Sequence, residues 1–146
     1  MGQSESIRPM TLVVEDDYAQ LEMISFLLEE SDCTVLLCQS AEAAELVLKD
    51  VGTDLSLLLT DVSLAGPMSG IDLAFMARQN LPHLDIIVTS ARPLPGPLPY
   101  GARFWAKPWS AMDVLREAQR LMSLQSGSAS EQEFAGLSST GDRIRC

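Results

Sequence analysis

Five short apolar segments, separated by longer stretches with helical periodicity, run through most of the chain. They lie within residues 11–15, 33–38, 55–61, 84–90 and 101–107. The third segment, LSLLLTD, is almost continuously apolar, which is typical of a strand in a parallel sheet that is covered on both faces. Strands that alternate with helices predict an α/β domain with a parallel sheet.

Helices are predicted between most of these strands. Apolar residues recur at helical spacing in residues 18–30, 41–51, 70–80 and 110–124. Ser40 precedes the second of these stretches and is a favourable N-cap. The last stretch begins with Ser-x-x-Asp, a capping-box pattern whose side chains bind the free N–H groups of the first turn. A helix therefore follows every predicted strand except the fourth.

The length of the chain predicts a single folded domain. Its 146 residues are enough to bury a substantial core. We predict a flexible leader over residues 1–8, the domain over 9–124 and a disordered tail over 125–146, which is rich in Ser and Gly. No second domain is expected after Leu124, so any output has to come from the surface of the domain or from its tail.

The composition excludes several classes of protein. Twenty acidic and ten basic residues give a formal net charge of -10, which argues against nucleic-acid binding and against attraction to an anionic membrane. No apolar run reaches the length of about 18 residues that a membrane span needs, and the first residues lack the apolar region of a secretory signal. Cys33, Cys38 and Cys146 have no metal-ligand spacing and are expected to be reduced, as in the cytoplasm.

Polar and charged residues stand at the carboxyl ends of the predicted strands. Glu15 and Asp16 follow the first strand, Asp61 ends the third, Ser90 ends the fourth and Lys107 ends the fifth. Ligands of open parallel sheets bind beyond the carboxyl ends of the strands. Carboxylates crowded together in a buried place normally need a cation or raised pKa values. These positions therefore predict a site for a cation.

The acidic run after the first strand has a second interpretation. Acids at the start of a helix cap its free N–H groups and are favoured by the helix dipole. A helix is predicted from Tyr18, directly after Asp17. We assign this capping role to Asp17 and leave the other two acids to the predicted site.

Four segments resemble, in their order along the chain, those of response-regulator receiver domains. They are VVEDD, LLLTDVSLAGPMSG, IIVTSA and RFWAKP. Each segment alone is a weak signal, whereas the ordered set is specific, and the resemblance covers residues 8–124. It implies a flavodoxin-like (CheY-like) fold, a doubly wound five-stranded parallel sheet with strand order 2-1-3-4-5.

The resemblance also implies a phosphorylation site. Asp61 would be the phosphoacceptor, and Lys107 would pair with the phosphoryl oxygens. Mg²⁺ would be bound directly by Asp16, by Asp61 and by the main-chain carbonyl of Ser63, and through a water molecule by Glu15. The first and third strands are neighbours in this order, so these acids would share one pocket, and an aspartate is a competent nucleophile toward phosphorus.

A hydroxyl group at the end of the fourth strand would bind the phosphoryl group. The loop after the third strand has one residue more than is usual in the family. Counting from Gly70 therefore selects Ser90, and Thr89 is the alternative. Phe104, three residues before Lys107, matches the aromatic residue that turns inward in the family. An ordinary core phenylalanine explains that residue almost equally well.

The segment SARPLPGPLPYGARFW departs from the family pattern. A fourth helix is usual here, but the segment is several residues too short for one. Its prolines remove backbone donors and favour extended geometry; they are Pro93, Pro95, Pro97 and Pro99. We predict an extended loop, a trimmed connection or alternatively a docking motif, which leaves the usual dimerisation and target surface of the family in doubt. The family also implies a cis bond before Pro108.

These observations predict a stand-alone receiver. It would take a phosphoryl group from a sensor histidine kinase or a histidine phosphotransfer protein, and signal through protein contacts or onward phosphotransfer. It is expected to be a monomer or weak dimer, and not an enzyme beyond its own phosphorylation and dephosphorylation. One alternative is a binding module that works without phosphorylation. Another, an aspartate-nucleophile phosphatase of the haloacid dehalogenase type, is disfavoured because Ser63 stands where that family has a second Asp.

Overall fold

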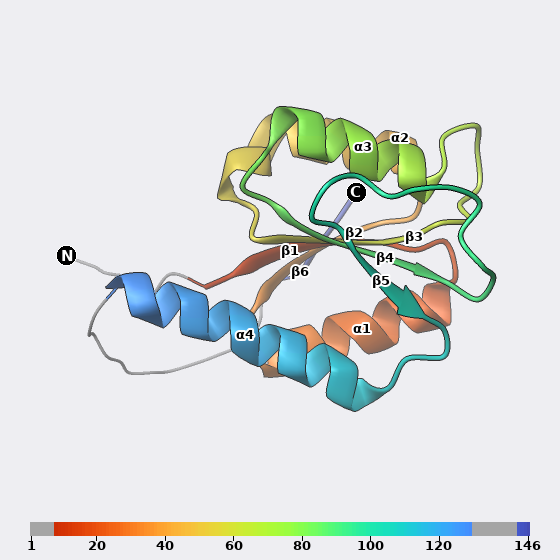
Figure 1. Ribbon diagram of the computed structural model, residues 1–146. Coiled ribbons are helices and arrows are strands. Elements are labelled where there is room, and N and C mark those ends of the chain that lie inside the picture. Colours follow the sequence, from red (N-terminus) through yellow and green to blue (C-terminus); the bar gives the residue numbers. More distant parts are fainter. Residues whose placement is uncertain (1–7, 130–142) are drawn as a thin grey trace.

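Strands and helices alternate through the protein, as the sequence predicts (Figure 1). The structure, a computed structural model, describes residues 8–129 and 143–146. Its strands are β1 (Met10–Val14), β2 (Thr34–Cys38), β3 (Leu57–Asp61), β4 (Asp85–Ser90), β5 (Arg103–Ala106) and β6 (Arg143–Arg145). Its helices are α1 (Tyr18–Glu30), α2 (Ala41–Val51), α3 (Gly70–Asn80) and α4 (Ala111–Ala129), and a short 3-10 helix, η1 (Gly52–Asp54), follows α2.

All the strands are parallel and form one sheet in the order β5-β4-β3-β1-β2-β6. β1 pairs with β2 on one side and with β3 on the other, so the direction in which the chain crosses the sheet reverses at β1. The predicted order 2-1-3-4-5 of the first five strands is confirmed. In such a sheet the loops after β1 and β3 diverge, which leaves space for a ligand at their carboxyl ends.

Helices cover both faces of the sheet, α2 and α3 on one and α1 and α4 on the other (Figure 1). Successive residues of a strand point to opposite faces. Leu12 and Val14 therefore belong to the core on the α2 side, and Val13 belongs to the core on the α1 side. This burial on two faces explains why the central strands are apolar at almost every position.

Each helix begins at a polar side chain that accepts a hydrogen bond from its first turn. Asp17, Ser40 and Ser69 cap α1, α2 and α3, and the capping box predicted from Ser110 is present at α4. The Asp17 carboxylate accepts the N–H of Gln20 at 3.2 Å, and this hydrogen bond lowers the pKa of Asp17. The capping role assigned to Asp17 is confirmed.

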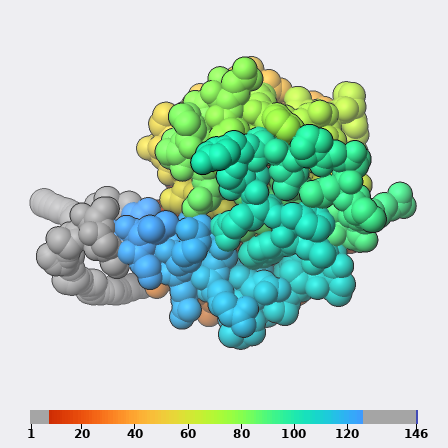
Figure 2. Space-filling view, viewed as in Figure 1, coloured from red at the N-terminus to blue at the C-terminus, as the bar shows by residue number. Residues whose placement is uncertain are grey.

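The segment between β4 and β5 contains no helix, as predicted from its prolines. Residues 91–102, all of them described, form bends and turns. Leu94 and Leu98 pack against the core on the α2 side, and Arg78 of α3 donates a hydrogen bond to the carbonyl of Tyr100 at 2.8 Å. The segment lies at the surface between α3 and α4 (Figure 2). A loop thus takes the place of the missing helix on this face.

The prediction of a disordered tail is wrong at both of its described ends. α4 continues to Ala129 instead of ending at Leu124, and Arg143–Arg145 form β6 beside β2. The unpaired N–H and C=O groups along the edge of β2 can bind any extended segment that reaches them, which is the physical reason for this sixth strand. Residues 130–142, and residues 1–7 of the predicted leader, lie outside the described residues.

The cysteines also differ from the expectation that all of them are reduced. Cys38 at the end of β2 and Cys146 after β6 form a disulfide. Pairing of the two strands brings their Cα atoms to 5.2 Å from each other, within the range that a disulfide requires. Cys33 is free and buried, and burial raises the pKa of its thiol to about 11.

A buried glutamate joins α4 to β5. Glu117 is 5% exposed and accepts hydrogen bonds from Arg103 at 2.9 and 2.7 Å and from Arg120 at 2.7 Å. Arg120 also donates to Asp85 in β4 at 2.7 Å. Burial alone would raise the pKa of Glu117, but the hydrogen bonds from Arg103 and Arg120 outweigh it and lower the pKa. These contacts fix α4 against the β4–β5 edge of the sheet.

We expect Glu117→Gln to lower the free energy of unfolding by about 2 kcal/mol at neutral pH, because charge-assisted hydrogen bonds are lost. Because the pKa of Glu117 is lowered in the folded protein, its carboxylate contributes its full stabilisation at pH values above 4.5, the ordinary pKa of the group. This contribution disappears as the pH falls through the lower pKa of the folded protein. The difference between wild type and variant in urea unfolding should therefore narrow below pH 4.5. Glu45→Gln, which removes a surface ion pair to Lys49, should change stability by less than about 0.5 kcal/mol. A Glu117 effect that does not vary with pH would contradict this account.

Candidate functional site

Three carboxylates lie together beyond the carboxyl ends of β1 and β3. Val14 is paired with Thr60, so the residues that follow them, Glu15 and Asp61, are adjacent. Glu15 is 3% and Asp61 8% exposed, whereas Asp16 is exposed. Each of the three acids has an oxygen that could bind a metal ion, and these oxygens all lie within 4.8 Å of one another. The structure therefore brings together three of the predicted metal ligands.

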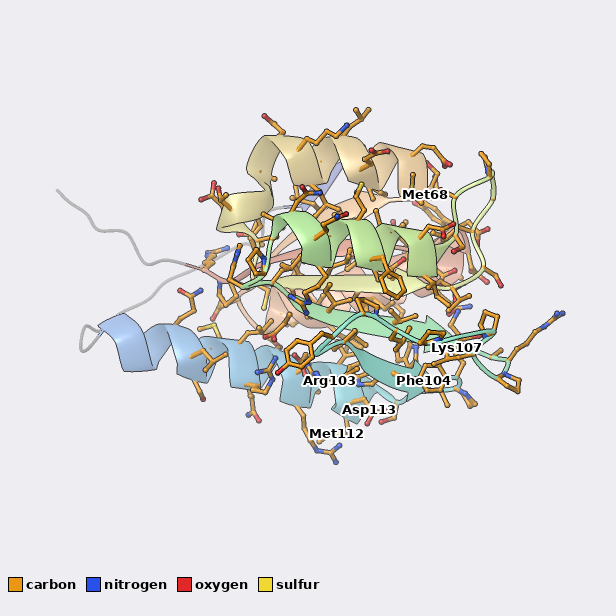
Figure 3. The ribbon with its side chains drawn as sticks, turned by 45° about the horizontal axis from the view of Figure 1, so that its top comes forward. Met68, Arg103, Phe104, Lys107, Met112 and Asp113 are labelled. Atoms are coloured by element: carbon orange, nitrogen blue, oxygen red, sulfur yellow. A yellow bond between two sulfur atoms is a disulfide. The ribbon has the colours of Figure 1, made fainter. Side chains whose placement is uncertain are left out.

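Lys107 reaches this acidic group from the end of β5 (Figure 3). Its Nζ lies 3.0 Å from Glu15 Oε1 and 3.5 Å from Asp61 Oδ1. Its backbone N–H donates to the carbonyl of Ser90 at 2.9 Å, which ties it to the end of β4. The peptide bond to Pro108 is cis, as the resemblance implies. Residues separated by 92 positions in sequence thus meet in one ion pair.

The site carries more negative charge than the lysine can balance. Burial raises the pKa of Asp61, and Lys107 counteracts this only in part. Burial likewise raises the pKa of Glu15, although its carboxylate accepts hydrogen bonds from the Asp17 N–H and from Lys107. Asp16 repels the charge of Asp61 and adds to that increase. Three carboxylates against one ammonium group favour the binding of a further cation.

The donor set fits Mg²⁺. This ion prefers carboxylate oxygens, keeps several waters and binds at about 2.1 Å, so two of its ligands lie up to about 4.2 Å apart. That separation is close to the 4.8 Å within which the three carboxylate oxygens lie. Glu15 is already held by Lys107 and by the Asp17 N–H, which suits its predicted contact through water. The direct binding of Mg²⁺ by Asp16 and Asp61 stays a prediction.

The loop of residues 62–69 borders the site and carries Ser63, the predicted carbonyl ligand. Ser63 is exposed and lies two residues after Asp61, and its role as a ligand stays a prediction. The loop is held by Glu42 of α2, whose Oε2 accepts the N–H of Met68 at 3.0 Å. This contact could not be predicted from the sequence, because an acid in the first turn of a helix is already explained by the helix dipole.

The two candidate hydroxyl groups of β4 point to opposite faces of the sheet, as neighbouring residues of a strand must. Thr89 is in register with Asp61 and with Trp105, and its hydroxyl is buried without a hydrogen-bond partner in the described part of the chain. The Ser90 hydroxyl accepts the N–H of Arg92 at 3.0 Å, so its proton is free to be donated. The choice between them stays a prediction.

Phe104 lies on the same face of the sheet as Ser90. It is paired with Val88, two residues before Ser90, and residues two apart share a face. Its side chain is 38% exposed and lies beside the helix-free loop, on β5 (Figure 3). The structure therefore places the predicted aromatic and the preferred hydroxyl on one face, and it shows that Phe104 is not an ordinary buried core residue.

A family model described as the response regulator receiver domain matches residues 11–94. The chain belongs to this family. The match includes the three carboxylates and the Ser90 region, and it ends before β5 and Lys107.

Solved receiver domains share the fold of this receiver. A CheY-like receiver domain protein from Methanospirillum hungatei JF-1 has 24% identity and a TM-score of 0.69, with 84% of this chain and 99% of that chain covered. A receiver domain protein from Clostridium thermocellum has 21% identity and a TM-score of 0.68, with coverage of 82% and 98%. The receiver domain of the hybrid histidine kinase CckA has 23% identity and a TM-score of 0.68, with coverage of 77% and 98%.

No curated protein sequence matches this receiver significantly. Among its described residues, none of the helices combines the length and the apolar character that crossing a bilayer requires.

We expect Asp61→Asn to make the receiver more stable when no metal is present. Burial raises the pKa of Asp61 above its ordinary value of 3.8. The charge of Asp61 therefore begins to oppose folding as the pH rises above 3.8, and it opposes folding fully once the pH exceeds the raised pKa of the folded protein. Removing the charge should raise the free energy of unfolding at pH 7 by on the order of 1 kcal/mol. Mg²⁺ at 100 times its Kd should stabilise the wild type by about 2.7 kcal/mol and the variant far less. Thermal unfolding with EDTA and with Mg²⁺ measures both effects, and equal Mg²⁺ stabilisation of the two proteins would contradict the assignment of Asp61 as a ligand.

Proposed function

We propose that this receiver accepts a phosphoryl group on Asp61, with Mg²⁺ bound beside it, from a phosphohistidine of a sensor histidine kinase or a histidine phosphotransfer protein. The observation that carries the proposal is the position of Lys107 Nζ, 3.0 Å from Glu15 and 3.5 Å from Asp61. A lysine in this position can contact an oxygen of a phosphoryl group on Asp61 while it remains paired with Glu15.

The carboxylate of Asp61 is the nucleophile. One of its oxygens forms a bond to phosphorus while the P–N bond of the phosphohistidine breaks and its electron pair returns to the imidazole nitrogen. Little covalent chemistry is needed from the protein, so positioning and charge neutralisation are its main contributions. Asp61 is held in place because β3 is paired on both sides, with β1 and with β4.

Charge neutralisation comes from the residues around Asp61. Lys107 donates to the phosphoryl oxygens and offsets the charge that develops on them. Asp16, Asp61 and the Ser63 carbonyl would hold Mg²⁺, which would supply further positive charge beside the phosphoryl group. Glu15 orients Lys107 through the 3.0 Å contact and completes the acidic side of the pocket.

Ser90 is proposed to detect the phosphorylated state. Its hydroxyl can donate to a phosphoryl oxygen and give up its present contact with the N–H of Arg92. Movement of residues 91–102 toward Asp61 would then change the surroundings of Phe104 on the same face. Because no helix follows β4, the moving element is a loop.

The remaining properties follow from this proposal. The receiver passes its signal through protein contacts or onward phosphotransfer, acts as a monomer or weak dimer, and has no enzymatic activity beyond its own phosphorylation and dephosphorylation. The cytoplasm, the compartment expected from the sequence, is proposed for the receiver as well. The formal net charge of -10 disfavours nucleic acid and an anionic membrane as partners.

Intact-protein mass after incubation with acetyl phosphate and Mg²⁺ tests the proposal. We expect the wild type to gain the mass of one phosphoryl group and to gain nothing without the metal. Asp61→Asn should gain nothing under either condition, whereas Asp54→Asn, a change of an exposed aspartate in η1, should behave as the wild type. An adduct that persists in Asp61→Asn would overturn the assignment. A folded, Mg²⁺-binding wild type without any adduct would favour the phosphorylation-independent binding module.

A further inference from the structure

The disulfide between Cys38 and Cys146 fastens a distant part of the chain to the edge of the sheet. The two cysteines are 108 positions apart in sequence. β6 runs parallel to β2 with Arg143–Arg145 opposite Val35–Leu37, and the N–H of Cys146 donates to the carbonyl of Leu37 at 2.8 Å. A strand of three residues contributes few hydrogen bonds, and the disulfide adds a covalent link between β6 and β2.

Cys38 lies against the acidic pocket. Its carbonyl accepts the N–H of Glu15 at 3.1 Å, which fixes the backbone at the first carboxylate of the site. Two residues later, Ser40 forms an isolated bridge with Ala65 in the loop that borders the site. The segment that carries the disulfide therefore contacts both sides of the pocket, the end of β1 and the loop after β3.

The three cysteines differ in how an external reagent can reach them. Cys146 is exposed, whereas Cys38 has no exposed surface. A thiolate from solution can thus attack the sulfur of Cys146, and the bond electrons leave on the sulfur of Cys38. Cys33 is fully buried, and burial raises the pKa of its thiol to about 11, so it does not compete in this exchange.

We propose that Cys38 and Cys146 form a thiol–disulfide switch that fastens β6 to β2 when oxidised and thereby stiffens the wall of the acidic pocket. A peroxide is the oxidant: one thiolate attacks a peroxide oxygen to give a sulfenic acid, and the second thiolate displaces water from it. In total two thiols and one hydrogen peroxide give one disulfide and two waters. A protein dithiol reverses the reaction by exchange at Cys146.

This switch fits the cellular compartment proposed for the receiver. Disulfides in the cytosol of most organisms are rare and, where present, are usually transient and redox-sensing. A transient disulfide of this kind requires that a reagent can reach one of its cysteines, and Cys146 is an exposed residue. The effect of the switch on metal binding rests on the proposed function, because it assumes that the acidic pocket binds Mg²⁺. The disulfide and its effect on stability do not depend on the proposed function.

The first experiment compares the full chain treated with hydrogen peroxide and the full chain treated with dithiothreitol. We expect the oxidised wild type to lose two hydrogens in mass, to remain monomeric on a non-reducing gel and to melt roughly 5–15 °C above the reduced protein. Cys33→Ser should show the same changes, and Cys146→Ser should show none of them. A disulfide that involves Cys33, a disulfide-linked dimer, or equal melting temperatures in both states would overturn the proposal.

The second experiment measures binding of Mg²⁺ alone by calorimetry in both redox states. A stiffened pocket should bind the ion roughly 3- to 10-fold more tightly in the oxidised protein, and the difference should vanish in Cys146→Ser. Equal affinities in the two states would overturn the link to the pocket while the melting data still support the disulfide. If the ion binds in a redox-dependent way but acetyl phosphate gives no adduct in either state, the proposed function fails and the switch stands.

Discussion

We expect Lys107→Met to reduce the rate at which acetyl phosphate phosphorylates Asp61 by about 10²- to 10³-fold, the usual cost of removing one group that stabilises developing charge. Methionine keeps the length and the apolar stem of lysine but has no ammonium group. Without that group, the carboxylates of Glu15 and Asp61 lose the contacts of 3.0 and 3.5 Å that Lys107 makes with them. The same loss removes an interaction that lowers the pKa of both carboxylates.

The chain offers a matched control for this change. Lys49 is the other of its two lysines. It lies on α2 with its side chain 68% exposed and forms a surface ion pair with Glu45 at 3.4 Å. Lys49→Met should phosphorylate at the rate of the wild type. Quenched-flow measurements followed by intact mass give the rates, and circular dichroism verifies that each variant is folded. A Lys107→Met rate within threefold of the wild type, which is about 0.65 kcal/mol in activation free energy, would show that the ammonium group does not act on the phosphoryl group.

The strands and the polar residues at their ends could be predicted from the sequence because they depend on local patterns, whereas the strand order followed from the resemblance to receiver domains. Each central strand needs apolar residues on two faces, which LSLLLTD displays directly. Glu15 and Asp61 then had to meet, since β1 and β3 are neighbours in the CheY-like order and their ends lie at one edge. The absence of a helix in residues 91–102 could also be predicted, because the alternating prolines of this segment are incompatible with a helix.

The features that the sequence did not predict depend on contacts between distant residues of common types. Glu117 falls on a helix like any surface acid, and only the packing of α4 against β5 gives it the guanidinium groups of Arg103 and Arg120. β6 is three residues long, too short for a recognisable periodicity, and its pairing joins segments more than a hundred residues apart. An odd number of cysteines without metal-ligand spacing suggested reduced thiols, and only the strand pairing shows which two meet.

Gly70→Ala is expected to destabilise the receiver by about 2–3 kcal/mol, as overpacking in a rigid place does. A methyl group on Gly70 would overlap the main-chain carbonyl oxygen of Asp61 and would lie 2.9 Å from the hydroxyl oxygen of Thr60. Neither side can move easily. Gly70 donates its N–H to the carbonyl of Val62 at 2.9 Å and begins α3, and Asp61 is the last residue of the central strand β3.

The effect on phosphorylation should exceed the effect on stability. The added methyl group can be accommodated only if the backbone of Asp61 or the start of α3 moves. A shift of about 1 Å at a reacting group can reduce a rate 10²-fold. Gly96→Ala is the control, because no atom lies within 4 Å of the added methyl group; it should leave both unfolding and phosphorylation unchanged. Urea unfolding and the acetyl phosphate assay are run on both variants. If Gly70→Ala matches Gly96→Ala in both assays, the close contact between α3 and Asp61 does not constrain the site. If Gly70→Ala loses phosphorylation at temperatures where it is fully folded, the glycine is required to position Asp61.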